Sequence, residues 1–104
     1  MPFPFVERDE ERVRPALIVS NTGLGKDSAL FWALMITSSK GREPWPDDVP
    51  IGPDHEEYGL PVPCLIRTAK LSTLSFDAIE RRLGRLPEPL QAHVRVQLAE
   101  RLSL

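Results

Sequence analysis

The stretch Ala29-Leu30-Phe31-Trp32-Ala33-Leu34-Met35-Ile36-Thr37 is the most apolar part of this 104-residue chain, and it decides the fold. This continuous apolar run, led by the bulky pair Phe31 and Trp32, predicts a strand. The uncharged run around it, residues 28–39, is about twelve residues long, far short of the roughly 20 residues that a membrane-spanning helix needs. We therefore expect a soluble protein rather than a membrane-spanning one.

Prolines on both sides of this strand limit what the first two thirds of the chain can form. Six of the eleven prolines fall within residues 44–63, where they prevent a helix interior. The runs 16–19 and 64–71 predict two further strands, and 49–51 predicts a short edge strand because Pro50 interrupts it. Simple alternation along 64–71 would place Arg67 and Lys70 on opposite faces, so that only one of them faces a given groove.

The last third of the chain changes its period. Leu90, Val94, Leu98 and Leu102 recur every four residues, which predicts an amphipathic helix over residues 89–102, with Pro87 and Pro89 suited to its start. Residues 75–84 are ambiguous, because Ser75 can cap a short helix there. We predict one domain over residues 1–104, mainly β with a C-terminal α-helix, built as a small β-barrel.

Charge and composition limit the classes of function. Hydrophobic residues at 41% and charged residues at 27% are typical of globular proteins. Residues 1–60 carry six Lys/Arg against eleven Asp/Glu, whereas residues 61–104 carry seven against four. This asymmetry argues against non-specific packaging of duplex DNA and leaves room for a small groove that contacts RNA. No basic segment followed by an apolar one opens the chain, so we expect a cytoplasmic protein.

Metal sites and protein nucleophiles have little support. Asp54-His55-Glu56-Glu57 are consecutive residues in a loop, and consecutive side chains point in different directions, so we predict a solvated acidic loop and no metal or cofactor. Cys64 is the single cysteine, which excludes a disulfide scaffold and a zinc ribbon, and we expect it to be buried in the core.

Two places have the chemistry to hold a phosphodiester. Arg14 directly precedes Pro15 and a predicted strand, and Thr37-Ser38-Ser39-Lys40 ends the most apolar strand with three hydroxyls and a cation. A guanidinium binds two phosphate oxygens at once, and hydroxyls donate to a third. A surface arginine and strand-end hydroxyls are also common without any ligand, and the pattern alone leaves both interpretations open.

The same residues carry a family resemblance. The blocks RPALIVS (14–20), ITS (36–38), WPDDV (45–49), VPCLIRTAKLSTL (62–74) and IERRLGRL (79–86) together resemble the PemK/MazF family of toxin–antitoxin endoribonucleases. The resemblance implies an SH3-like barrel of the CcdB/PemK/MazF type that forms a homodimer. Family members begin with a complete strand, so the resemblance also implies that the first strand is truncated here and that an unpaired sheet edge remains beside it.

The resemblance further implies a bacterial type II toxin that inhibits growth by cutting single-stranded mRNA without a metal, and that a cognate antitoxin neutralises. Arg14 and Thr37 match the family's catalytic residues, and the RNA's own 2′-hydroxyl would attack the phosphate. Because arginine stays protonated, the general base is left open among Glu7, Asp9, Glu10 and Glu11.

Around this pair we expect an RNA-binding set that follows the strand ends and the third predicted strand: Ser38, Ser39, Lys40, Trp45, Arg67 and Lys70. Trp45 would stack a base, although a Trp-Pro loop anchor is an equally good interpretation. Two other functions stay open: a CcdB-like toxin that binds DNA gyrase, and a non-catalytic binding module of the same fold.

Overall fold

The computed structural model describes residues 4–9, 12–21 and 23–103. Its strands are β1 (Pro4–Asp9), β2 (Arg12–Ile18), β3 (Leu30–Ser38), β4 (Asp48–Pro50), β5 (Cys64–Ser75) and β6 (Ile79–Arg82). One α-helix, α1 (Glu88–Leu102), follows them, and three short 3-10 turns, η1 (Lys26–Ser28), η2 (His55–Tyr58) and η3 (Phe76–Ala78), lie between strands. The prediction of a mainly β protein with a C-terminal helix is confirmed.

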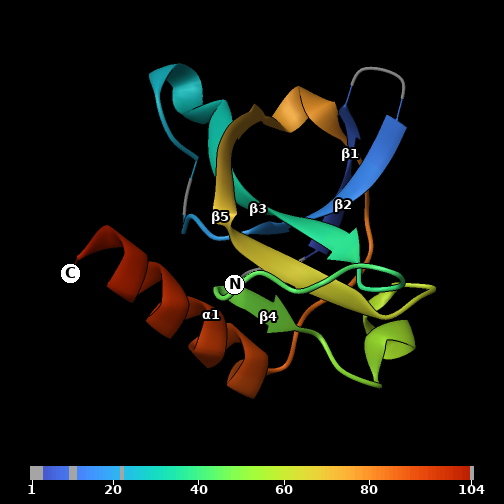
Figure 1. The fold of residues 1–104 in the computed structure, drawn as a ribbon. Helices are drawn as coiled ribbons and strands as arrows, with labels where there is room; N and C mark the ends of the chain where they lie inside the picture. The colour runs from blue at the N-terminus through green and yellow to red at the C-terminus, as the bar shows by residue number, and fades with distance from the viewer. Residues whose placement is uncertain (1–3, 10–11, 22, 104) are drawn as a thin grey trace.

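The strands form one antiparallel sheet in the order β4-β5-β3-β2-β1-β6. The sheet curls strongly, and α1 packs beneath its β4–β5 end (Figure 1). Within the described residues β4 and β6 do not pair with each other, so the curled sheet remains an open barrel. As the proline at position 50 predicts, β4 is short and lies at an edge.

The unpaired edge that was expected beside the first strand is covered. β1 pairs with β2 from Pro4 opposite Leu17 to Asp9 opposite Arg12, and it pairs with β6 on its other side. The predicted edge is therefore absent at this place, because β6 adds to β1. The sheet edges lie at β4 and β6 instead.

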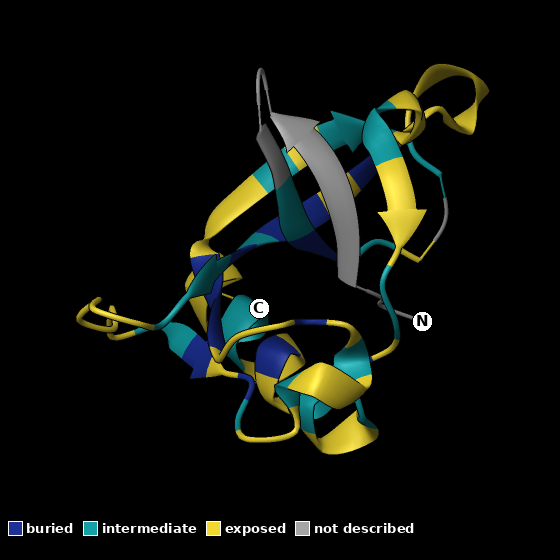
Figure 2. Cartoon of the chain, turned by 90° about the vertical axis from the view of Figure 1, so that its right-hand side faces the viewer, coloured by how far each residue is buried: buried dark blue, intermediate teal, exposed yellow. Residues whose placement is uncertain are grey.

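Two apolar clusters hold the sheet together. Figure 2 marks the buried parts of the chain from which they come. The larger includes Leu17, Leu34 and Ile66, and Val94 of α1 belongs to it. The smaller centres on Phe31, whose ring lies 4.8 Å from that of Phe76 between centroids. The strand that dominates the sequence thus contributes to both clusters.

The helix begins and ends close to the prediction. Leu90, Val94 and Leu98 pack against the larger cluster, whereas Leu102 is exposed in the last turn. Residues 75–84 resolve into a single 3-10 turn followed by β6. Ser75 does cap that turn, because its hydroxyl accepts a hydrogen bond of 3.2 Å from the Asp77 amide.

The connection into α1 crosses the loop after η2 at very close range. A Cβ on Gly59 would lie 2.5 Å from the carbonyl oxygen of Leu83, and one on Gly84 would lie 2.9 Å from that of Tyr58. Gly59 also has a φ of 84°, which other residues adopt only at a cost. The two glycines therefore allow the backbone around residues 58–59 and that around residues 83–84 to cross in direct contact.

Candidate functional site

The register of the sheet brings Arg14 and Thr37 together. β2 and β3 are antiparallel, with Leu17 opposite Leu34 and Ala16 opposite Met35. Continuing this register by two residues places Arg14 of β2 level with Thr37 of β3. Both side chains are partly buried and line the same cleft, which residues of β5 and of the loop after β3 also line.

This cleft has a volume of about 590 Å³. Its polar lining consists of cations and hydroxyls: Arg14, Thr37, Ser38, Arg42, Arg67, Lys70 and Ser72. Among the described residues, no carboxylate lines it. Four cations around one hollow make a site that attracts a polyanion, and hydroxyls beside them add donors for phosphate oxygens.

The predicted RNA-binding set divides in two. Ser38, Arg67 and Lys70 line the cleft with the Arg14–Thr37 pair, whereas Ser39, Lys40 and Trp45 do not. The Ser39 hydroxyl donates instead to the carbonyl oxygen of Pro63 at 3.1 Å, and the Lys40 amide donates to Ser38 Oγ at 3.2 Å. These contacts fasten the turn that follows β3.

A bulge in β5 makes the expected separation of Arg67 and Lys70 wrong. Leu34 pairs with Leu71, but the next residue of β3, Met35, pairs with Arg67. Residues 68–70 of β5 therefore have no partner on β3, and the alternation of side chains between the two faces is interrupted between Arg67 and Lys70. As a result both Arg67 and Lys70 line the cleft.

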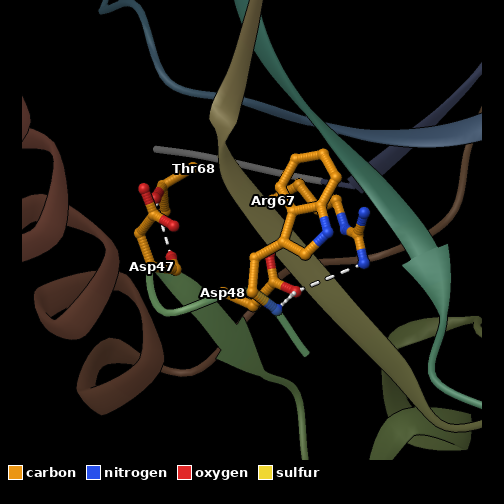
Figure 3. Close-up of polar contacts among 5 residues, drawn as sticks. Asp47, Asp48, Arg67 and Thr68 are labelled. Carbon is orange, nitrogen blue, oxygen red and sulfur yellow. Dashed lines mark hydrogen bonds and ion pairs between the residues drawn. The ribbon is translucent and has the colours of Figure 1, made fainter. Parts of the chain in front are cut away.

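Arg67 is held by a cluster of contacts at the cleft margin (Figure 3). Its Nη2 lies 3.5 Å from Asp48 Oδ2, and its Cζ lies 3.7 Å from the centre of the Trp45 ring. The same carboxylate oxygen accepts a hydrogen bond of 2.8 Å from the Trp45 amide. The Lys70 ammonium lies 5.9 Å from the same ring, so Trp45 is in contact range of two cations.

Two polar residues of the cleft were missed from the sequence. Arg42 lies in the turn after β3, where its amide donates to the carbonyl oxygen of Ser39 at 3.2 Å. Its signal in the sequence was a second basic residue two positions after Lys40. Ser72 follows the bulge of β5, and no sequence pattern marks the residue at which that bulge ends.

Cys64 also lines the cleft, and it is buried as predicted. Its Sγ donates to the carbonyl oxygen of Val62, and burial raises the pKa of the thiol. His55 Nδ1 lies 2.8 Å from the carbonyl oxygen of Leu60. In the described part of the chain, no three His, Cys, Asp or Glu residues cluster as metal ligands would.

The candidate general bases fall mostly outside what the structure describes. Glu10 and Glu11 lie outside the described residues, as do the side chains of Glu7 and Asp9. The backbone register of β1 and β2 does place Glu7 opposite Arg14.

Comparison with known proteins shows what this chain resembles. The family model described as PemK-like, MazF-like toxin of type II toxin–antitoxin system matches residues 1–102. No curated protein sequence matches the chain.

Solved structures share the fold over nearly the whole chain. An endoribonuclease in complex with its cognate antitoxin, from a mycobacterial species, has a TM-score of 0.77 at 24% identity over 97% of this chain and 91% of the other. The Mycobacterium tuberculosis toxin MazF-mt6 has a TM-score of 0.79 at 17% identity over 100% and 98%. The MazE–MazF structure from Deinococcus radiodurans has a TM-score of 0.78 at 22% identity over 98% and 92%. At these identities the likeness establishes the fold.

Proposed function

Because this chain belongs to the PemK-like, MazF-like toxins of type II toxin–antitoxin systems, we propose that it is a metal-independent endoribonuclease that cleaves single-stranded RNA. One observation supports this most directly: the β2–β3 register brings Arg14 and Thr37 into one cleft with three further cations. A cleft of this composition suits a flexible polyanion better than a neutral ligand.

The proposed reaction uses the substrate as its own nucleophile. The 2′-hydroxyl of one nucleotide loses its proton and attacks the adjacent phosphorus. The bond from phosphorus to the 5′-oxygen of the next nucleotide breaks, and that oxygen takes up a proton. The products are a 2′,3′-cyclic phosphate and a free 5′-hydroxyl, and no metal or protein nucleophile takes part.

Arg14 and Thr37 have distinct roles in this reaction. Negative charge builds up on the non-bridging oxygens as phosphorus becomes five-coordinate, and the Arg14 guanidinium stabilises it with two parallel N–H groups. The Thr37 hydroxyl donates to the same phosphate and fixes its orientation. Arg42, Arg67 and Lys70 bind the flanking phosphates, which holds the strand in place for attack.

The test is cleavage of a long single-stranded RNA in the presence of EDTA. Arg14→Lys keeps the charge and loses the two-pronged geometry, and Thr37→Val keeps the shape and loses the hydroxyl. We expect each to slow cleavage by about 100-fold or more, the effect of removing one donor to a developing charge. Ser103→Ala, which removes a hydroxyl at the end of α1 and outside the cleft, is the matched control.

Analysis of the cut ends decides the chemistry. Discrete cuts that carry 2′,3′-cyclic phosphates, and that vanish when the nucleotide at the cut is 2′-deoxy, support the proposal. Cleavage that EDTA abolishes, or that leaves 3′-hydroxyl ends, would contradict it. Absence of cleavage by a folded protein would instead favour the non-catalytic module or the gyrase-binding toxin.

The proposal includes two protein partners. An antitoxin with an acidic segment would match the cations of the cleft, and a solved structure of this fold contains a cognate antitoxin. A second copy of the chain is the other partner, since Leu30 and Trp32 expose apolar surface two residues apart on β3. Sedimentation equilibrium should give twice the chain mass of 11.7 kDa.

We also propose that residues 1–104 act as one toxin domain in the cytoplasm, where mRNA is available. Within the described residues, no helix has both the length and the apolar character needed to cross a membrane.

A further inference from the structure

The Asp48 carboxylate is unusually deeply buried for an acid beside a cationic cleft. Its side chain is 1% exposed, and that of its partner Arg67 is 10% exposed. Removing both charges from water is costly unless each is matched closely by the other and by hydrogen bonds. Asp48 Oδ2 meets part of this need with two contacts, from Arg67 Nη2 and from the Trp45 amide.

The surroundings restrict how Arg67 can move. The Trp45 ring covers one face of the guanidinium at 3.7 Å, and Asp48 holds one of its terminal nitrogens. Next to this pair, the Thr68 hydroxyl donates to the carbonyl oxygen of Asp47 at 2.7 Å, which fastens the segment before β4 to the bulge of β5 (Figure 3). The guanidinium is therefore fixed at the cleft margin before any ligand arrives.

The ion pair does not use all the donors of Arg67. A guanidinium has five N–H groups, and Asp48 Oδ2 lies beside only one of its terminal nitrogens, at 3.5 Å. Arg67 Nε and Asp48 Oδ1 are buried without a hydrogen-bond partner among the described residues. The pair therefore leaves N–H groups of Arg67 unused, and Arg67 lines the cleft in which an anion would bind.

We propose that Asp48 is a positioning residue that orients Arg67 toward a phosphate of the RNA, with Trp45 as the platform under the guanidinium. This inference rests on the proposed function for the identity of the ligand. It gives Trp45 a role different from base stacking, because the ring face at 3.7 Å is occupied by Arg67. It also explains why an acid, Asp48, lies beside a cleft that binds anions: its carboxylate orients Arg67.

The sign of one substitution separates positioning from simple electrostatics. Asp48→Asn keeps the shape and can still accept from the Trp45 amide, but it releases Arg67. If charge alone mattered, removing an acid would tighten RNA binding; if positioning matters, binding weakens. We expect binding of a 2′-O-methyl oligoribonucleotide, measured by fluorescence anisotropy, to weaken about tenfold, as loss of one well-placed charge-assisted contact does.

Asp47→Asn is the matched control, because it removes the same charge one residue away and its side chain takes no part in the Arg67 contacts. We expect it to bind within about twofold of the unsubstituted protein or slightly more tightly. In cleavage assays Asp48→Asn should raise KM and leave kcat within about twofold, and Asp48→Glu should restore part of the loss. An Asp48→Asn protein that binds as tightly as the original would overturn the proposal.

A second readout does not need RNA. The Arg67 Nε–H gives an NMR cross-peak that Arg67→Gln identifies by its loss, and burial should make it sharp and slow to exchange. We expect Asp48→Asn to broaden it and Asp47→Asn to leave it unchanged. If the protein binds no RNA at all, the proposed function fails, and this signal alone decides whether Asp48 orders Arg67.

A folding defect does not prevent the test. Where circular dichroism shows that Asp48→Asn is unfolded, Trp45→Leu removes the platform instead and should broaden the same cross-peak and weaken binding. An unchanged cross-peak in a folded variant refutes the positioning role.

Discussion

The cations of the cleft set a quantitative expectation for how salt weakens RNA binding. Four of them line the cleft, and each phosphate neutralised on a single strand contributes about 0.7 to the slope of log affinity against log salt. Full engagement therefore gives a slope of about −2.8. Raising the salt from about 50 to about 200 mM would weaken binding about 50-fold, or about 20-fold if Arg67 stays committed to Asp48.

Binding of the 2′-O-methyl oligoribonucleotide at a series of salt concentrations measures this slope directly, because the probe lacks the attacking hydroxyl and is not consumed. Arg42→Gln should make the slope shallower by about 0.7, the share of one phosphate contact. Lys26→Gln removes an exposed cation from η1, outside the cleft, and should leave the slope unchanged. A slope shallower than about −1, or an equal effect of both substitutions, would refute the assignment of the cleft as the polyanion site.

Three further predictions concern stability. Gly59→Ala should lower the unfolding free energy by about 2–4 kcal/mol, because φ is positive there and the added Cβ would clash with the carbonyl oxygen of Leu83. Gly52→Ala, at a φ of 92° but with open space around it, should cost only about 1 kcal/mol. Equal losses in thermal melts would contradict the close crossing at Gly59. Thr68→Val should cost about 1–2 kcal/mol in denaturant titrations, since it leaves the partly buried carbonyl of Asp47 without its donor. An unchanged midpoint would argue against that hydrogen bond. The unfolding free energy should fall as the pH rises past about 8.5, because the raised pKa keeps the Cys64 thiol protonated in the folded state while the unfolded state loses the proton first. Titrations on either side of that pH should show a smaller fall in Cys64→Ala, and an identical fall would exclude the thiol as its source.

Much of the fold follows from local patterns that leave few alternatives. The prolines of residues 44–63 remove helices from that region, and the four-residue spacing of Leu90, Val94 and Leu98 has no explanation other than a helix packed on one side. Pro50 lacks the N–H that a central strand needs, so β4 at an edge was predictable from one residue. These features are local in sequence, which is why reasoning from sequence captures them.

The site was predictable only in part, because its assembly depends on register. Arg14 and Thr37 stood out as residues at strand ends, but nothing in either segment states that β2 and β3 are neighbours with Ala16 opposite Met35. This pairing decides that the two residues line the same cleft. Pairing is a long-range property, set by which apolar faces fit together across the whole sheet.

The bulge of β5 shows why strict alternation fails at this cleft in particular. A regular strand would give the cleft either Arg67 or Lys70. Residues 64–68 of β5 are all buried, with the Thr68 hydroxyl donating to the carbonyl oxygen of Asp47 and the Arg67 guanidinium paired with Asp48. Both partners come from the segment just before or at the start of β4. The bulge of β5 is thus stabilised by its contacts with residues 45–48. The same contacts hold Arg67 at the cleft and fasten residues 45–48 to β5. A substitution that straightened β5 would therefore remove a cation from the cleft and release the loop at once, so binding and local stability should change together in variants of this cluster.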